Sequence, residues 1–267
     1  MIPEVMVRSF LHEMKLALER SGFKPPGEGE ARVVLFDSAP WAGLCVDAQE
    51  LLDAGERGRA LRFRHAHNHN TYVLAHAGWR AALGMTLGMD AADVPLSSTA
   101  NGQPQLPDTV YATSLSHSDS HVAMAIAKAK TVGVDIERYP PRHALHGLVD
   151  VLCAPAEAAA LLALPAAAQT LALLQLWTRK EALLKAFGVG LREAPAAVVA
   201  DLDRVVEPPA SAAGVSACCV HQLELPSHLA GALAAPTSIT RYSVHWLTPS
   251  DGGERAPTPS PDALFHP

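Results

Sequence analysis

The stretch VGVDIE, residues 132–137, places two acidic side chains in an otherwise apolar run. Successive side chains of a strand point to opposite faces, so Asp135 and Glu137 project from one face about 6–7 Å apart if this run is a β-strand. Two like charges at that separation raise each other's pKa unless a cation lies between them. The run therefore predicts a strand that carries either a Mg²⁺ site or, where the strand ends in solvent, a pair of hydrated acids.

The composition limits the class of protein. The 267 residues allow one large domain or two compact halves with a real core. Apolar residues make up 49% and charged residues 18%, which is typical of a globular chain. The net charge of −6 argues against a general nucleic-acid binder, whose surface would be broadly basic.

The cysteines and the N-terminal charges indicate a cytoplasmic protein. Cys45, Cys153, Cys218 and Cys219 form no C-x-x-C pair, so we expect reduced thiols. Charged residues interrupt any signal-peptide core in the first 20 residues, and no apolar run is long enough to predict a membrane span.

Hydrophobic periodicity and turn residues predict helices followed by strands, twice along the chain. The first predicted helix is 5–18, and the second opens with a capping box of Asp47 and Glu50 and runs to about Arg62. The third is capped by Asn70 and ends near Gly84 or Gly88. The fourth is 167–187, with Gly188 as its stop. The predicted strands are 32–37, 111–118, 121–129 and 131–137, followed by 215–225, 228–234 and 240–247 in one antiparallel sheet.

This order predicts an α+β fold of two similar halves, each with helices packed on a small antiparallel sheet and related by a pseudo-twofold. The expected divisions are an N-terminal helical extension (1–30), an N-terminal half (31–128), a C-terminal half (129–248) and a disordered tail (249–267) that is rich in Pro, Gly and Ser.

The predicted helix 167–187 carries a second group of polar side chains. Glu181 and Lys185 are four residues apart and share a helical face, with Trp177 one turn earlier. Alone, this spacing is equally typical of a surface ion pair beside a packed tryptophan.

Together, the two segments resemble the 4′-phosphopantetheinyl transferase superfamily, whose pattern is G-x-D followed by W/F-S/T-x-K-E-A-x-x-K. Gly133 and Asp135 supply the first element, and Trp177, Thr178, Lys180, Glu181, Ala182 and Lys185 supply the second, 177 − 135 = 42 positions later. SLSHS (114–118) and NGQPQL (101–106) resemble two further family elements. The length is similar to that of the larger, monomeric, surfactin-synthetase-activating class, in which two similar halves are fused.

The chain departs from the family pattern at three places. Gln103 stands where lysine is frequent, Thr113 and Ser114 replace an aromatic residue and asparagine, and Asn70 replaces an arginine. None of these changes affects the carboxylates, so they bear on coenzyme A binding more than on the reaction.

The resemblance implies transfer of the 4′-phosphopantetheine arm of coenzyme A to a serine of an apo carrier protein, with release of 3′,5′-ADP. It implies Mg²⁺, with Mn²⁺ as an alternative, held by Asp135, Glu137 and Glu181. Glu181 would be the base for the carrier serine, Glu137 could share that task, and Lys185 would neutralise or protonate the departing phosphate.

The same resemblance nominates residues for binding coenzyme A. Ser116 and His117 would contact phosphate, and Lys180 would add a supporting phosphate contact or form an ion pair. Basic side chains in RGRALRFRHAHNHN (57–70) would reach the 3′-phosphate, although they could also be a solvated helix face: Arg57, Arg59, Arg62 and Arg64. His65, His67 and His69 in this stretch stay unassigned.

The implied partners are an acyl or peptidyl carrier protein and coenzyme A, with no nucleic acid and no membrane, and the protein would be a monomer. Arg138 and Arg142, just after the acidic strand, could contribute to carrier docking or be solvated. Two alternatives remain open: a catalytically silent coenzyme A-binding protein and a metal-dependent phosphohydrolase that uses the same three acids.

Overall fold

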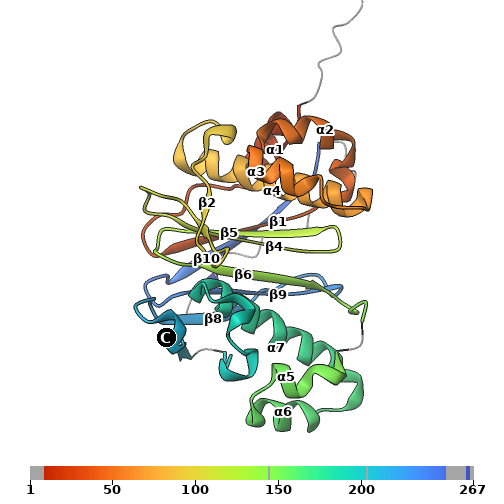
Figure 1. Cartoon of the computed structure of the whole chain (residues 1–267), viewed down its shortest axis with the longest axis vertical. Helices are drawn as coiled ribbons and strands as arrows, with labels where there is room; N and C mark the ends of the chain where they lie inside the picture. The colour runs from red at the N-terminus through yellow and green to blue at the C-terminus, as the bar shows by residue number, and fades with distance from the viewer. Residues whose placement is uncertain (1–8, 144, 203, 251–262, 265–267) are drawn as a thin grey trace, which may run out of the picture. The chain divides into compact units, whose positions relative to one another are not determined.

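The computed structural model describes residues 9–143, 145–202, 204–250 and 263–264, and these form a mixed α+β fold (Figure 1). The helices are α1 (Phe10–Arg20), α2 (Cys45–Ala48), α3 (Ala54–Ala60), α4 (Ala66–Leu87), α5 (Val149–Leu152), α6 (Pro155–Leu162) and α7 (Ala166–Phe187). The strands are β1 (Glu30–Asp37), β2 (Ser97–Ser98), β3 (Pro104–Gln105), β4 (Ala112–Ser118), β5 (His121–Ala127), β6 (Gly133–Arg138), β7 (Val205–Val206), β8 (Cys218–Gln222), β9 (Leu229–Pro236), β10 (Arg241–Leu247) and β11 (Ala263–Leu264).

The chain divides into two compact units that interleave along the sequence. The first comprises Met1–Pro25, Leu35–Val94 and His245–Pro259, and the second comprises Pro26–Val34, Pro95–Val244 and Ser260–Pro267. The predicted division into halves at residues 128 and 129, and the pseudo-twofold between them, stay predictions. Within the described residues, no helix combines the length and the apolarity needed to cross a membrane.

Helices dominate the first unit. Phe10 of α1 and Phe36 of β1 both pack edge-on against Trp41, at ring-centroid distances of 5.8 and 6.1 Å. The side chain of Ser9 caps α1 by accepting a hydrogen bond from the backbone of His12. Apolar burial of these three aromatic rings therefore fixes the start of α1 in the core of this unit.

The predicted helix boundaries in this unit are partly wrong. Two Asp-x-x-Glu patterns lie close together, and the capping box forms at Asp53 and Glu56, where it opens α3, and not at Asp47. Asp47 instead accepts a hydrogen bond from the backbone N–H of Phe10 at the start of α1. Helix α4 begins four residues before Asn70. Of the two predicted stops, Gly84 and Gly88, it ends at Gly88, which has a left-handed φ of +68°.

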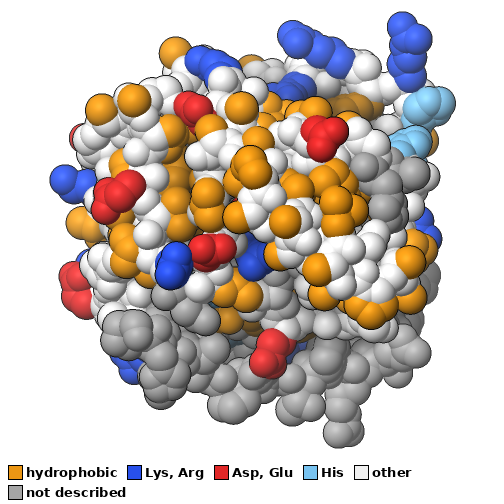
Figure 2. Space-filling view, turned by 90° about the horizontal axis from the view of Figure 1, so that it is seen from below, with side chains coloured by type: hydrophobic (Ala, Val, Ile, Leu, Met, Phe, Trp, Pro, Cys, Tyr) orange, Lys and Arg blue, Asp and Glu red, His pale blue; other side chains and the backbone are white. Residues whose placement is uncertain are grey.

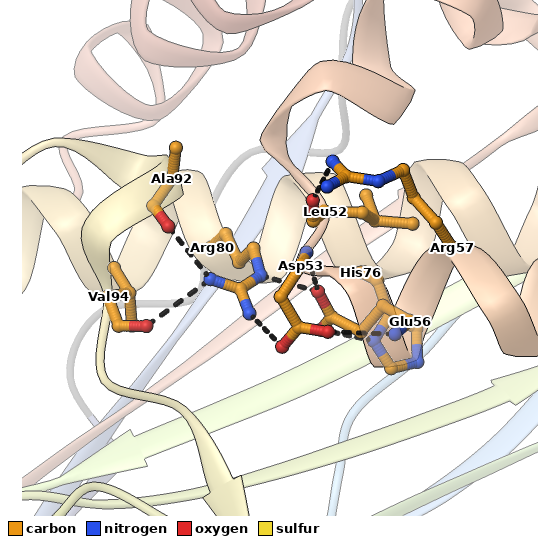
Figure 3. Close-up of polar contacts among 8 residues, drawn as sticks. All are labelled: Leu52, Asp53, Glu56, Arg57, His76, Arg80, Ala92 and Val94. Carbon is orange, nitrogen blue, oxygen red and sulfur yellow. Dashed lines mark hydrogen bonds and ion pairs between the residues drawn. The ribbon is translucent and has the colours of Figure 1, made fainter.

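A buried arginine joins the short helix α3 to α4 (Figure 3). Arg80 is only 1% exposed, and it donates from Nε to Glu56 Oε2 at 2.6 Å and from Nη2 to Asp53 Oδ2 at 2.7 Å. The same guanidinium donates to the carbonyl oxygens of Ala92 and Val94. The start of α3 and the segment after α4 are thus fastened to one charged group.

Two main sheets account for most of the strands. The order is β11-β10-β1-β5-β4 in the five-stranded sheet and β6-β9-β8-β7 in the four-stranded one. Strands β8, β9 and β10 were expected in one sheet, but β10 pairs in the five-stranded sheet. The strand pattern in a sequence identifies a strand without identifying its partner, which explains this error.

The four-stranded sheet carries α7 on one face (Figure 1). Every residue of β9 is buried, and Leu173, Leu183 and Phe187 of α7 belong to the same hydrophobic core as Val220 of β8. Gly133 lies where α7 comes closest to β6, because a Cβ there would be 1.9 Å from the carbonyl oxygen of Ala182. Only glycine leaves room for this approach.

The predicted disordered tail is only partly described. Ala263 and Leu264 form β11 and pair antiparallel with Tyr242 and Arg241 of β10, which contradicts the expectation for these two residues. Residues 251–262 and 265–267 lie outside the described part of the chain.

Replacing Gly133 by alanine should lower the free energy of unfolding by about 3 kcal/mol or more, because a methyl group would collide with backbone atoms of α7 that cannot rotate away. Gly147 provides the matched control, since a Cβ there would meet nothing within 4 Å. Urea unfolding of Gly133→Ala and Gly147→Ala measures the difference. Equal stability of the two variants would contradict the close packing.

Replacing Glu56 by glutamine should cost about 3 kcal/mol at pH 7, because Arg80 keeps its buried charge and loses a charged partner. Burial acts to raise the pKa of Glu56, but hydrogen bonds from His76 and the Asp53 backbone and the charge of Arg80 outweigh it and lower the pKa below 4.5. A lowered pKa adds stability above the unfolded-state value, and that stability is lost as the pH falls through the folded-state value. The difference between wild type and Glu56→Gln in urea unfolding should therefore shrink from pH 7 to pH 3, and an unchanged difference would refute this.

Candidate active site

One open pocket of about 340 Å³ in the second unit gathers side chains from three elements. Strand β4 contributes Leu115, Ser116 and His117, strand β6 contributes Asp135 and Glu137, and helix α7 contributes Trp177, Glu181 and Lys185. The acids of the G-x-D segment and the charged face of α7 therefore line the same cavity. The resemblance to the family pattern predicts this grouping.

The two acids of β6 point toward β4, and serine hydroxyls hold them there. Ser116 Oγ donates to Asp135 Oδ1 at 2.7 Å, and Ser118 Oγ donates to Glu137 Oε2 at 2.6 Å. β4 and β6 are edge strands of different sheets, so side chains bridge the two edges. Asp135 is 4% exposed, and a carboxylate this deep needs hydrogen-bond donors to replace the water that it loses.

Lys185 supplies the nearest positive charge to the acids. Its Nζ lies 2.7 Å from Asp135 Oδ1 and 3.1 Å from the carbonyl oxygen of Val134. Asp135 Oδ1 thus accepts two hydrogen bonds, whereas Asp135 Oδ2 is buried and has no hydrogen-bond partner. An unpaired buried carboxylate oxygen is costly, and it marks a place for a further donor or cation.

The geometry of α7 follows from its sequence. Trp177, Glu181 and Lys185 recur every four residues and therefore share one face, while Ala182 and Ala186 on the adjoining face allow close approach to Gly133. Gly188 ends the helix with a left-handed φ of +70°.

Gln103 caps the end of α7. Its side-chain amide donates to the carbonyl oxygens of Lys185 at 3.2 Å and Ala186 at 3.4 Å. Asn101 on the same hairpin donates to the carbonyl oxygen of Gly188 at 3.2 Å. The family departure at Gln103 therefore places a helix cap where a lysine is frequent.

Burial and like charges raise the pKa values of two acids in the pocket. For Glu181 burial is the largest cause, the charge of Asp135 adds to it, and the result is a pKa of about 7 despite the opposing charge of Lys185. Burial also raises the pKa of Glu137, although a hydrogen bond from Ser118 opposes the shift. The pocket thus holds more negative charge than one ammonium group can neutralise.

The donor set fits a divalent cation only in part. Within the described ranges, no group of three or more His, Cys, Asp or Glu side chains is arranged to hold a metal ion. Mg²⁺ usually takes one or two protein carboxylates and completes its shell with water and substrate phosphate, so a ready-made cage is not required. The orphaned Asp135 Oδ2 and the raised pKa of Glu181 both favour a cation here, and assignment of Asp135, Glu137 and Glu181 as ligands stays a proposal.

Lys180 lies outside this pocket. It is fully buried, and its Nζ pairs with Glu157 Oε2 at 2.7 Å and donates to the carbonyl oxygens of Pro195 and Val198. All three N–H groups of the ammonium are used, so the structure corrects the predicted phosphate contact in favour of the ion pair.

The arginines predicted for the 3′-phosphate belong to the first unit. All four side chains are exposed: Arg57, Arg59, Arg62 and Arg64. Their contact with coenzyme A stays a prediction. Asn70, the departure nearby, accepts a hydrogen bond from Cys45 Sγ at 3.3 Å in the same unit.

Two contributions to the site were missed at the level of sequence. Trp177 was noted in the motif without a role, and it lines the pocket together with Glu137. Ser118 was passed over, although the alternation of Ser114, Ser116 and Ser118 places three hydroxyls on one face of a strand. That alternation is a signal that could have found it.

Comparison with known proteins agrees with this geometry. A family model described as the 4′-phosphopantetheinyl transferase superfamily matches residues 131–233, which include β6, α7 and most of β9. The matched segment therefore contains the acids of β6 and the charged face of α7.

Two named proteins are similar to the chain. The 4′-phosphopantetheinyl transferase HetI of Nostoc sp. is 29% identical over 149 residues, 54% of this chain and 63% of the relative. The protein slr0495 of Synechocystis sp., whose name provisionally gives it the same activity, is 26% identical over 146 residues, 54% of this chain and 59% of the relative. The matches span less than two thirds of either relative.

Proposed function

We propose that this chain, whose residues 131–233 match the 4′-phosphopantetheinyl transferase superfamily, transfers the 4′-phosphopantetheine arm of coenzyme A to a serine of an apo carrier protein. The observation that carries the proposal is the single pocket in which Asp135 and Glu137 of β6 meet Glu181 and Lys185 of α7. These four residues perform the charge-dependent parts of the proposed reaction.

In the proposed reaction, the carrier serine oxygen forms a bond to the phosphorus that bears the pantetheine arm. The bridging P–O bond of the pyrophosphate breaks, and 3′,5′-ADP leaves with the electron pair. Glu181 accepts the serine proton, and its raised pKa of about 7 suits a base that must hold that proton near neutral pH. Lys185 stands one turn along the helix, where its ammonium can neutralise charge on the departing phosphate.

A bound Mg²⁺, or Mn²⁺ in its place, would neutralise the pyrophosphate oxygens as charge grows on the leaving group. Asp135 would offer its unpartnered Oδ2 to that ion, with Glu137 and Glu181 beside it. Ser116 and His117 of β4, which line the same pocket, would contact phosphate. The exposed arginines of residues 57–64 would bind the 3′-phosphate of coenzyme A.

The carrier would dock on the second unit. Figure 2 looks from the side of α5 and α6 and shows hydrophobic side chains among scattered charges. The exposed apolar residues in and beside these two helices are Leu148, Val151, Leu162 and Leu164. Arg138 and Arg142 both pair with Asp119, so an apolar contact is the stronger candidate for docking.

The finer assignments belong to the same proposal. The surfactin-synthetase-activating class, the monomeric state and the cytoplasmic location follow from the resemblance and the composition. Which carrier protein is modified depends on the shape of the docking surface, and a panel of apo acyl and peptidyl carriers would identify it.

The purified protein, incubated with coenzyme A, Mg²⁺ and an apo carrier, should increase the mass of the carrier by about 340 Da, the mass of the transferred arm. Intact-protein mass spectrometry measures the shift, and omission of Mg²⁺ should abolish it. Cleavage of coenzyme A without modification of any carrier in the panel would instead support a phosphohydrolase. Absence of both products would support a silent coenzyme A-binding protein.

Glu181→Gln should slow the transfer by about 10²–10⁴-fold, because glutamine cannot accept the serine proton. Glu193→Gln is the matched control, since Glu193 lies outside the pocket and accepts a hydrogen bond from Ser211. Transfer rates under saturating coenzyme A test the pair. A Glu181→Gln variant as fast as the parent would remove Glu181 from the role of base.

A further inference from the structure

Three hydroxyl groups from β4 reach β6, and each serves a different acceptor or donor. Ser114 Oγ accepts a hydrogen bond from the backbone N–H of Val134 at 3.1 Å. Ser116 Oγ donates to Asp135, which Lys185 also contacts. Ser118 Oγ donates to Glu137, the second pocket acid of β6.

Two hydrogen bonds hold the hydroxyl group of Ser118 in one orientation. Its Oγ accepts a hydrogen bond from the backbone N–H of Arg138 at 3.2 Å. A serine hydroxyl has only one proton, and with a lone pair committed to Arg138 that proton points to Glu137 Oε2 at 2.6 Å. The short distance is typical of a hydroxyl that donates to an ionised carboxylate.

We propose that Ser118 is a positioning residue that fixes the Glu137 carboxylate for a divalent cation bound in the pocket. The inference rests on the proposed function and goes further by giving a role to Ser118, the last residue of the SLSHS segment, to which the resemblance assigned none. Trp177 of α7 lines the pocket together with Glu137, so the carboxylate that Ser118 holds faces the charged helix across the cavity. With its orientation fixed, the carboxylate offers its remaining lone pairs to the ion without first losing rotational freedom.

The contrast within β4 separates positioning from simple support of the fold. Ser114 is as close to β6 as Ser118 is, but its partner is a backbone N–H and no acid of the pocket. Loss of either hydroxyl removes a hydrogen bond from a backbone N–H of β6, that of Val134 for Ser114 and that of Arg138 for Ser118. Only loss of the Ser118 hydroxyl frees a carboxylate of the site.

The test measures Mn²⁺ binding to the full-length protein in the presence of coenzyme A, by electron paramagnetic resonance of the free ion. Ser118→Ala should raise the Kd for Mn²⁺ about tenfold, the scale on which partners of metal ligands act. Ser118→Thr keeps the hydroxyl and should restore the parental Kd. Ser118→Cys keeps the size but is a weak donor, so it should bind as weakly as Ser118→Ala and serves if that variant does not fold.

Ser114→Ala is the matched control and should lower the thermal stability while it leaves the Kd for Mn²⁺ unchanged. Binding of coenzyme A without metal should be the same in all variants. The inference is overturned if Ser118→Ala and Ser118→Cys bind Mn²⁺ like the parent, if Ser118→Thr fails to rescue, or if Ser114→Ala weakens binding equally. A parent protein that bound no Mn²⁺ would overturn the proposed function, and this inference with it.

Discussion

The site depends on how closely helix α7 lies on strand β6. The backbone of Gly133 allows the carbonyl of Ala182 an approach that a Cβ would block at 1.9 Å, and this approach fixes the helix over the strand. Glu181 and Lys185, on the neighbouring face of the helix, then reach the pocket that holds Asp135. The glycine of the G-x-D segment is thus required for packing. Because the helix lies this close to the strand, Lys185 can reach the aspartate two residues later.

Once brought together, the charges of the pocket are out of balance. Three carboxylates and one ammonium group share a partly buried space, and desolvation penalises every ionised acid that has no partner. Proteins rarely keep such an arrangement for stability alone, because apolar residues would fill the same volume at lower cost. The imbalance is explained if a cation and the phosphates of a substrate complete the site, and the serines of β4 hold the acids ready for them.

Much of this arrangement could be predicted from the sequence, and the failures have a common cause. Strands β4, β5 and β6 and the end of α7 at Gly188 follow from local patterns of apolar residues and turn residues, and the structure confirms them. The predicted start of the second helix was wrong because two similar capping patterns lie close together in the sequence. The pattern that forms is the one whose Asp53 and Glu56 bind the buried Arg80, which is distant in sequence. The ion pair of Lys180 with Glu157 and the sheet to which β10 belongs are also settled by partners far along the chain.

The central claim is that acids from β6 and α7 converge on one divalent ion. A crystal structure with Mn²⁺ and coenzyme A tests it most directly, since anomalous scattering identifies the ion. The account predicts a Mn²⁺ peak at about 2.1 Å from carboxylate oxygens of both Asp135 and Glu181, with pyrophosphate oxygens in the remaining positions. A peak that no oxygen of Asp135, Glu137 or Glu181 contacts, with Lys185 still paired to Asp135, would contradict it.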